Sequence, residues 1–159
     1  MAIEIERKFL VDLKRFSPNN SGVTIKQGYI PTKDNTAVRV RISADQAVLT
    51  IKGENNGISR LEFEYPIPLP DASMMLENLC KGSLIDKTRY IIEYQGYTWE
   101  VDVFHGDNQG LVVAEVELEN ETDTPSVPPW ITIEVSGQVR YYNSNLMHHP
   151  YKNWEDEDI

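Results

Sequence analysis

Charged residues of a single sign recur at alternate positions in several short segments of the chain. Arg39 and Arg41 form a basic pair, and Glu115 and Glu117 form an acidic pair. Adjacent basic groups bind phosphate oxygens, and paired carboxylates supply the oxygen ligands that divalent metals such as Mg²⁺ prefer. An ordinary solvated surface has no reason to sort its charges by sign, whereas a site that holds a polyanion does. The spacing therefore indicates a site for a polyanion and divalent metal ions.

The same alternation predicts the elements that carry these charges. In a β-strand, residues i and i+2 point to the same face, so each charged pair lies opposite a row of apolar residues. Eight segments alternate in this way and are rich in residues typical of strands. They span 2–11, 23–30, 37–42, 48–52, 59–65, 84–94, 97–104 and 112–119. The connections are too short for parallel crossovers, so neighbouring strands are expected to pair antiparallel.

Two architectures are compatible with this pattern. In one, a sheet packs its apolar face on a core and turns its charged face to water. In the other, the strands close into a barrel whose charged face points inward, and helices, loops or a second subunit cover the apolar outside. The sorting of charge favours the second. We therefore expect a mainly β (α+β) fold, an eight-stranded antiparallel β-barrel tunnel with a charged interior and a few covering helices, as a single domain over residues 1–159.

Several segments are candidates for the outer cover. A helix is predicted over 71–81, capped by Asp71 and ended by Gly82. Its apolar face would carry Met74, Met75 and Leu79. A second short helix is predicted over 140–147. Further cover is expected from aromatic residues late in the chain: Trp130, Tyr141, Tyr142 and Trp154.

The composition limits the partners. The 25 acidic and 15 basic residues give a formal net charge of −10. This acidity argues against non-specific binding to nucleic acid and against docking on anionic membranes. It does not exclude an anionic substrate, because nearly half of the basic residues fall on the proposed inward face. These are Lys8, Arg39, Arg41, Lys52, Arg60, Lys87 and Arg89.

The remaining composition narrows the compartment and the chemistry. Cys80 is the only cysteine, so neither an intramolecular disulfide nor a cysteine-based zinc site is possible. The first residues contain no apolar segment of a signal peptide, and no apolar stretch approaches the ~20 residues of a membrane-spanning helix. The cytoplasm is the simplest expectation.

An ordered series of motifs resembles a known family. The segment Glu4-Ile5-Glu6-Arg7-Lys8 is similar to the Glu-x-Glu-x-Lys signature of the CYTH superfamily, the triphosphate tunnel metalloenzymes. Further matches follow in order: Gln27-Gly28-Tyr29, Arg39-Val40-Arg41, Lys52, Arg60-Leu61-Glu62-Phe63-Glu64, Lys87-Thr88-Arg89, Glu115-Val116-Glu117, Glu134 and Arg140-Tyr141-Tyr142-Asn143. The series spans nearly the whole chain and resembles the short bacterial inorganic triphosphatases. The resemblance implies an eight-stranded tunnel that binds a triphosphate with Mg²⁺ or Mn²⁺.

The resemblance also implies roles for the inward charges. The expected phosphate-binding residues are Lys8, Arg39, Arg41, Lys52, Lys87 and Arg89. The expected metal ligands are Glu4, Glu6, Glu115 and Glu117. The residues expected to act in catalysis are Glu4, Glu6, Lys8, Lys87 and Glu117. Supporting tunnel charges are expected at Arg60, Glu62, Glu64, Glu100 and Asp102, and Glu119 lies either at the tunnel mouth or at a solvated strand end.

Several functions remain open at this level. The leading hypothesis is hydrolysis of inorganic tripolyphosphate to pyrophosphate and phosphate by metal-activated water, because a short chain leaves little sequence for a nucleobase pocket. The alternatives within the family are a class IV adenylate cyclase, which makes cyclic AMP from ATP, and a thiamine triphosphatase. Outside it stand a non-catalytic polyphosphate- or nucleotide-binding module and an acidic β-domain that binds a protein. The expected partner is a small polyanion, with neither nucleic acid nor membrane, and a homodimer would cover the apolar outer face.

Overall fold

The computed structural model describes residues 3–82 and 84–155, which form nine strands and two α-helices. The strands are β1 (Ile3–Val11), β2 (Val23–Ile30), β3 (Ala37–Ser43), β4 (Gln46–Lys52), β5 (Ser59–Ile67), β6 (Ile85–Tyr94), β7 (Tyr97–Phe104), β8 (Val112–Glu117) and β9 (Ile131–Glu134). The helices are α1 (Leu69–Asn78) and α2 (Asn143–Leu146), with 3₁₀ turns at Gly106–Asn108, Val139–Tyr141 and Tyr151–Asn153. The first eight strands agree with the predicted segments to within two residues at each end, and Ala2 lies outside the described residues.

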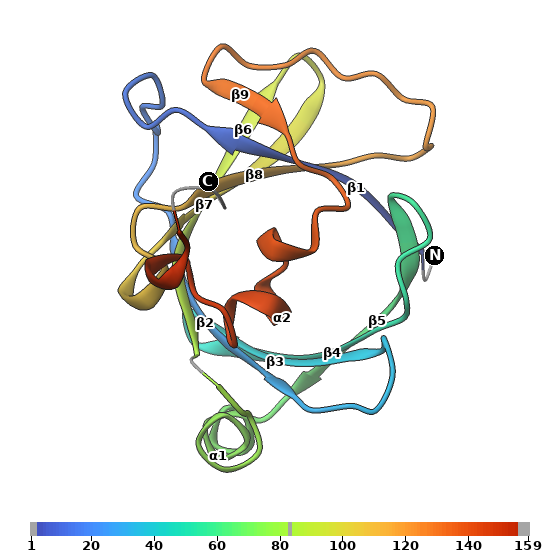
Figure 1. Ribbon diagram of the computed structural model, residues 1–159, viewed down its shortest axis with the longest axis vertical. Helices are drawn as coiled ribbons and strands as arrows, with labels where there is room; N and C mark the ends of the chain where they lie inside the picture. Colours follow the sequence, from blue (N-terminus) through green and yellow to red (C-terminus); the bar gives the residue numbers. More distant parts are fainter. Residues whose placement is uncertain (1–2, 83, 156–159) are drawn as a thin grey trace.

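The strands close into a barrel. Their order is β5-β4-β3-β2-β6-β7-β8-β1, and β1 also pairs with β5 (Figure 1). Every pairing is antiparallel. The predicted eight-stranded antiparallel barrel is confirmed. A ninth strand, β9, was not predicted; it pairs with β1 outside the ring.

Strand β1 has three different partners along its length. Its first three residues pair with β5, residues 6–10 pair with β8, and Phe9 and Val11 pair with β9. Because β1 pairs on one side with β5 and on the other with β8, it closes the ring. It also carries the first charged motif of the sequence into the interior.

The outer face of the barrel is covered by two apolar clusters. On the β1–β8–β7 side, Trp99 is fully buried, and its ring lies 5.4 Å from Phe9 and 6.1 Å from Trp130. On the opposite side, α1 packs against β3 and β4 (Figure 1). There Ala72 and Leu76 bury against Val40 and Ala47. The expected cover by a helix and by the segment with Trp130 therefore holds.

The position and the apolar face of α1 differ from the prediction. The helix begins at Leu69 after Pro68, which is extended and makes no side-chain cap, so Asp71 is not the N-cap. Proline is favoured in the first helical turn, and Pro70 sets this earlier start. Met75 packs against the strands as predicted, but Met74 and Leu79 are 63% and 49% exposed. The residues of the helix that bury most fully are Ala72 and Leu76, four positions apart on one face.

The C-terminal segment closes one end of the barrel. Tyr141 and Trp154 belong to a third apolar cluster, as expected, whereas Tyr142 turns toward the barrel interior. The helix predicted over 140–147 is split, because the extended backbone of Tyr142 separates the 3₁₀ turn Val139–Tyr141 from α2. Viewed along the barrel, α2 lies within the outline of the ring (Figure 1). No helix among the residues seen is long and apolar enough to cross a membrane.

Candidate active site

The charged faces of the strands surround a cavity of about 200 Å³ inside the barrel. Seven basic side chains line it: Lys8, Arg39, Arg41, Lys52, Arg60, Lys87 and Arg89. Seven acidic side chains also line it: Glu4, Glu6, Glu62, Glu64, Glu100, Glu115 and Glu117. The alternation in the strands therefore has the inward orientation, and the alternative of a water-facing charged sheet is wrong.

Two of the expected inward acids lie elsewhere. Asp102 does not line the cavity, because its carboxylate is buried in the wall beneath two basic residues. Glu119 is exposed, because β8 ends at Glu117 and the chain leaves the barrel there. The solvated strand end, rather than the tunnel mouth, is thus the correct interpretation of Glu119.

Asp102 holds two cations of the site in place. Its carboxylate accepts from the Lys87 ammonium at 2.7 Å and from both ends of the Arg89 guanidinium at 2.8 and 2.9 Å. Burial opposes ionisation, yet Lys87 and Arg89 lower the pKa of Asp102 to about 2. Burial lowers the pKa of Lys87 to about 7, against the opposing effect of Asp102. The expected role of Asp102 as a supporting counter-charge agrees with this geometry.

Two arginines of β3 keep unsatisfied donor capacity. Arg39 lies 3.6 Å from Glu64, but its buried Nε has no hydrogen-bond partner. Arg41 donates from Nε to Gln27 Oε1 at 2.7 Å and has no carboxylate within ion-pair distance among the described residues. Burial, together with Arg39 and Arg89, lowers the pKa of Arg41 to about 10. Buried cations without counter-charges are costly unless an anion joins them, so this wall favours an anionic ligand.

The acidic side of the cavity is formed where β1 meets β8. Glu6 lies directly opposite Glu117 in the strand register, and Lys8 lies opposite Glu115. Burial and the neighbouring Glu115 raise the pKa of Glu6 well above its usual range. Although burial opposes the shift, Lys8, whose Nζ is 3.8 Å away, helps hold the pKa of Glu115 well below normal. Like charges placed opposite each other are destabilising, so this group favours a proton or a cation between its members.

A second acidic cluster lies at the β1–β5 contact. Lys52 contacts Glu4 at 3.2 Å and Glu62 at 3.1 Å, and Arg60 contacts Glu4 at 3.6 Å. Burial and a hydrogen bond with Glu4 raise the pKa of Glu62 to about 7. Arg60, expected as a supporting tunnel charge, is paired with Glu4.

The carboxylate oxygens of the cavity are suitable ligands for a divalent metal, although the side chains are not arranged as a preformed metal-binding group. Glu4, Glu6, Glu115 and Glu117 all line the one cavity and offer hard oxygen donors of the type that Mg²⁺ and Mn²⁺ prefer. Within residues 3–82 and 84–155, no three acidic, histidine or cysteine side chains stand ready as a metal-binding group. Ion binding at these carboxylates would therefore replace ion pairs and hydrogen bonds within the protein.

Three neutral residues at the site carry no signal in the charge pattern. The Tyr142 hydroxyl accepts a hydrogen bond from Asn55 at 2.7 Å, and the centre of the Tyr142 ring lies 5.2 Å from Lys8 Nζ. Gln27 and Asn143 hydrogen-bond to each other and to cations of the cavity. Their only signal in the sequence is that they fall within the motifs Gln27-Gly28-Tyr29 and Arg140-Tyr141-Tyr142-Asn143, and the structure pairs Gln27 with Arg41 in the register of β2 against β3.

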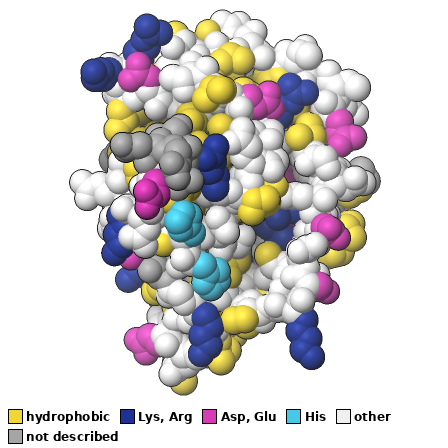
Figure 2. Space-filling model, viewed as in Figure 1, with side chains coloured by type: hydrophobic (Ala, Val, Ile, Leu, Met, Phe, Trp, Pro, Cys, Tyr) yellow, Lys and Arg dark blue, Asp and Glu magenta, His cyan; other side chains and the backbone are white. Residues whose placement is uncertain are grey.

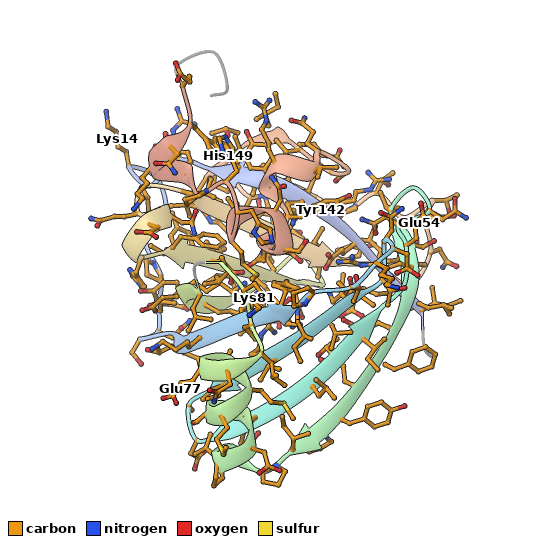
Figure 3. The ribbon with its side chains drawn as sticks, turned by 60° about the horizontal axis from the view of Figure 1, so that its bottom comes forward. Lys14, Glu54, Glu77, Lys81, Tyr142 and His149 are labelled. Atoms are coloured by element: carbon orange, nitrogen blue, oxygen red, sulfur yellow. The ribbon has the colours of Figure 1, made fainter. Side chains whose placement is uncertain are left out.

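A larger cavity of about 510 Å³ adjoins the charged one. It shares Tyr29, Ala37, Arg60, Tyr142 and Ser144 with the charged cavity, so it opens beside the polyanion site. Figure 3 shows Tyr142 between Glu54 on the β4–β5 loop and Lys81 after α1, both of which line this space. No pattern in the sequence indicates such a pocket, because strand ends and loops from distant segments form its walls.

The face of the molecule shown in Figure 2 lacks the sorting of charge seen inside. On the face shown in Figure 2, acidic and basic side chains are interspersed among apolar and polar ones. A broad basic patch, which nucleic-acid binding requires, is not a feature of this face.

Comparison with known proteins identifies the family. Residues 2–151 match the family described as the CYTH domain. The chain belongs to the CYTH family. Members of this family of triphosphate tunnel enzymes are metal-dependent and act on small polyanionic triphosphates.

Relatives of this CYTH chain are named inorganic triphosphatases. One from Acetivibrio thermocellus is 47% identical over 156 residues, 98% of this chain and 100% of that protein. One from Nitrosomonas europaea is 35% identical over 149 residues, 90% of this chain and 95% of that protein. Inorganic triphosphatases are enzymes that hydrolyse phosphoanhydride bonds.

Solved structures agree with the barrel. A crystal structure of an inorganic triphosphatase superposes with a TM-score of 0.65 at 33% identity, covering 91% of this chain and 97% of that one. An adenylate cyclase-like protein from Bacillus halodurans superposes with a TM-score of 0.62 at 19% identity, covering 76% and 84%. The second likeness shows the shared fold alone.

Proposed function

We propose that this protein hydrolyses inorganic tripolyphosphate to pyrophosphate and phosphate inside the barrel, with Mg²⁺ or Mn²⁺ bound. The observation that carries the proposal is the pair of arginines on β3, of which Arg39 is buried and Arg41 half-buried. Among the described residues, Arg39 Nε has no acceptor and Arg41 has no carboxylate within ion-pair distance. Phosphate oxygens would supply an acceptor and a counter-charge, and guanidinium groups bind them in bidentate geometry.

The other basic residues complete the phosphate cradle in this proposal. Lys8, Lys52, Lys87 and Arg89 line the same cavity from three different strands. They are expected to bind the remaining phosphate oxygens as the substrate threads between β1 and β6. Glu62, Glu64, Glu100 and Asp102 hold these cations apart and in position when the substrate is absent, with Arg60 paired to Glu4.

The proposed metal ligands are Glu4, Glu6, Glu115 and Glu117. The facing carboxylates of Glu6 and Glu117 support this assignment, because a divalent cation between them removes their mutual repulsion. When bound, the metal activates a water for in-line attack and neutralises charge on the phosphate chain.

The chain's own groups have distinct roles in the proposed step. Water adds to a terminal phosphorus and its released proton passes to solvent, while the bond from that phosphorus to the bridging oxygen breaks and pyrophosphate leaves with the bonding electron pair. Lys8 and Lys87 stabilise that charge, while the exposed carboxylate of Glu117 orients the water. Glu4 and Glu6 complete the set expected to act in catalysis.

A second candidate substrate is a triphosphate that carries an organic group. The 510 Å³ cavity favours it, because that space adjoins the polyanion site and has both apolar and polar walls, including Ile30, Val38 and Asn35. ATP or thiamine triphosphate would place its phosphates between the basic strands and its organic part in this cavity. The reaction would then be a hydrolysis or, in a cyclase, attack of a ribose hydroxyl on the α-phosphorus.

One panel of assays tests both candidates. Tripolyphosphate, ATP and thiamine triphosphate are each incubated with Mg²⁺, Mn²⁺ or EDTA, and the products are identified by chromatography. We expect phosphate and pyrophosphate from tripolyphosphate with either metal and no turnover with EDTA. Faster turnover of an organic triphosphate would favour the second candidate. Cyclic AMP from ATP, or binding without turnover, would contradict the hydrolase.

Two expectations about partners remain predictions. The outer face of β5 keeps Leu61, Phe63 and Tyr65 exposed, and the expected homodimer would cover such a face. Sedimentation analysis at micromolar concentration measures the oligomeric state. The expected lack of nucleic-acid binding is measured by a mobility-shift assay at low salt, where electrostatic binding is strongest.

A further inference from the structure

A chain of hydrogen bonds joins two cations of the cavity through two amide side chains. Arg41 Nε donates to Gln27 Oε1 at 2.7 Å, and Gln27 Nε2 donates to Asn143 Oδ1 at 3.1 Å. Lys87 Nζ donates to the same Asn143 Oδ1 at 2.9 Å. The chain crosses from β3 through β2 and α2 to β6, so α2 is tied to two walls of the barrel.

The cations fix the orientation of both amides. Guanidinium and ammonium groups only donate hydrogen bonds, so each must face an amide oxygen. The oxygen of Gln27 therefore points to Arg41, and its Nε2 is left to donate to Asn143. The oxygen of Asn143 receives donors from both Gln27 and Lys87, so its Nδ2 points away from them.

The free donor of Asn143 lies at the cavity. Asn143 is one of the lining residues, and no acceptor for Nδ2 occurs among the residues that the structure describes. Among the described residues, the buried side-chain donors without a hydrogen-bond partner are Arg39 Nε and Trp99 Nε1. Asn143 Nδ2 is not one of them, so this atom is accessible from the cavity. An acceptor from a ligand is therefore the available partner.

We propose that Asn143 is a further substrate-binding residue, whose Nδ2 donates to a phosphate oxygen of the triphosphate. This inference rests on the proposed function of the cavity. A neutral donor is useful here, because seven cations already repel one another and an amide adds affinity without adding charge. The donor is also held firmly. The neighbouring Tyr141 carbonyl accepts from Lys8 at 3.4 Å, and the Tyr142 hydroxyl accepts from Asn55 at 2.7 Å.

Two substitutions separate the donor from the acceptor of Asn143. Asn143→Asp keeps an acceptor for Lys87 and Gln27, removes the donor and adds a negative charge, whereas Asn143→Ala removes donor and acceptor without a change of charge. Asn145→Asp and Asn145→Ala are the matched controls, because Asn145 lies on the same helix and is not among the residues that line either of the two cavities. Binding of tripolyphosphate is measured by calorimetry in EDTA, and the melting temperature of each variant is recorded alongside.

We expect both Asn143 variants to bind tripolyphosphate about 10- to 100-fold more weakly than both Asn145 variants, as for the loss of a hydrogen bond to a charged group. Asn143→Asp should keep the wild-type melting temperature. Wild-type affinity in either Asn143 variant would overturn the inference. If Asn143→Asp bound as tightly as the wild type, Asn143 would only anchor Lys87. If Asn143→Ala did so, the donor would not be used in binding. The proposed function fails separately, and the inference with it, only if the wild-type protein neither binds nor hydrolyses tripolyphosphate.

Discussion

The Lys87 ammonium and the Asp102 carboxylate lie 2.7 Å apart within the wall of the barrel, and both side chains are buried. Lys87 reaches the cavity from β6, whereas Asp102 stays behind it on β7 and also holds Arg89. The pair thus links the stability of the wall to the charge that the wall presents to a ligand.

Removal of the Asp102 carboxylate should destabilise the protein strongly. Asp102→Asn leaves Lys87 buried without its counter-charge and Arg89 with Glu100 alone, and breaking a buried ion pair in this way typically costs about 3–5 kcal/mol. Urea unfolding at pH 7 measures the loss. The control is Asp107→Asn, whose exposed partner Lys152 lies 2.9 Å away and whose loss should cost less than about 1 kcal/mol. Equal effects of the two substitutions would contradict the structural role of Asp102.

Acid should remove the stabilisation of the fold that the Asp102 carboxylate provides. The pKa of Asp102 in the folded protein is about 2, below the value of ~3.9 in an unfolded chain. A lowered pKa stabilises the fold fully above the unfolded value, and the contribution is lost as the pH falls from about 4 to 2. The free energy of unfolding of the wild type should fall more steeply over this range than that of Asp102→Asn. Parallel profiles would show that Asp102 does not control acid stability.

Binding of tripolyphosphate should draw a proton onto Lys87. Burial lowers the pKa of Lys87 to about 7, so at pH 8 the amine is mostly neutral in the unliganded protein. A polyanion favours the charged form and raises that pKa. Calorimetry in EDTA, in two buffers of different ionisation enthalpy, should therefore reveal proton uptake. Lys87→Gln should abolish that part of the buffer dependence, and an unchanged dependence in this variant would assign the proton to another group.

Glu117 offers a clean test of the metal site. Its carboxylate is exposed to the cavity, and no ion pair engages it among the described residues, so Glu117→Ala should leave stability within about 0.5 kcal/mol. Loss of a metal ligand should nevertheless reduce tripolyphosphate turnover at least 100-fold. Glu119→Ala, two residues on and outside the cavity, should keep full activity at every Mg²⁺ concentration. Full activity in Glu117→Ala would remove this residue from the metal site.

Arg41 should show a conflict between stability and binding. Its guanidinium is half-buried and has no carboxylate within ion-pair distance among the described residues, so Arg41→Met should leave the free energy of unfolding unchanged or raise it. The same substitution should weaken tripolyphosphate binding at least tenfold, because a phosphate contact is lost. Arg15→Met, at an exposed site outside the cavity, should change neither property. Unfolding of Arg41→Met would instead indicate a structural role for Arg41.

The charged strands could be predicted because they obey a simple period. Alternation of charged and apolar residues over eight segments determined the barrel and the inward position of its acids and bases. The alternation fails as a guide at Glu119, where it continues although β8 has already ended at Glu117. Only the fold decides where β8 leaves the ring.

Elements without a strong period were harder to predict. The strand β9 has four residues, which are too few to show a pattern. The side of α1 that becomes buried depends on which strands the helix packs against, and not only on where its apolar residues lie. Tyr142 and Asn143 reach the cavity from the C-terminal segment, and Gln27 supports it from the wall behind. Neutral polar side chains such as these leave no mark in a charge pattern. The 510 Å³ cavity arises from loops and helices that the sequence places far apart.

The three-way pairing of β1 has a consequence for how the site forms. Strands β2 to β5 and β6 to β8 each pair with their neighbours in sequence, so both groups can assemble from local hairpins. Strand β1 instead pairs with β8, whose residues lie more than 100 positions later in the chain. Such long-range pairing is the slow part of β-sheet folding. The acidic side of the cavity, which β1 brings to β8, should therefore be the last part to appear, and in refolding experiments activity should return only with the final closure of the ring.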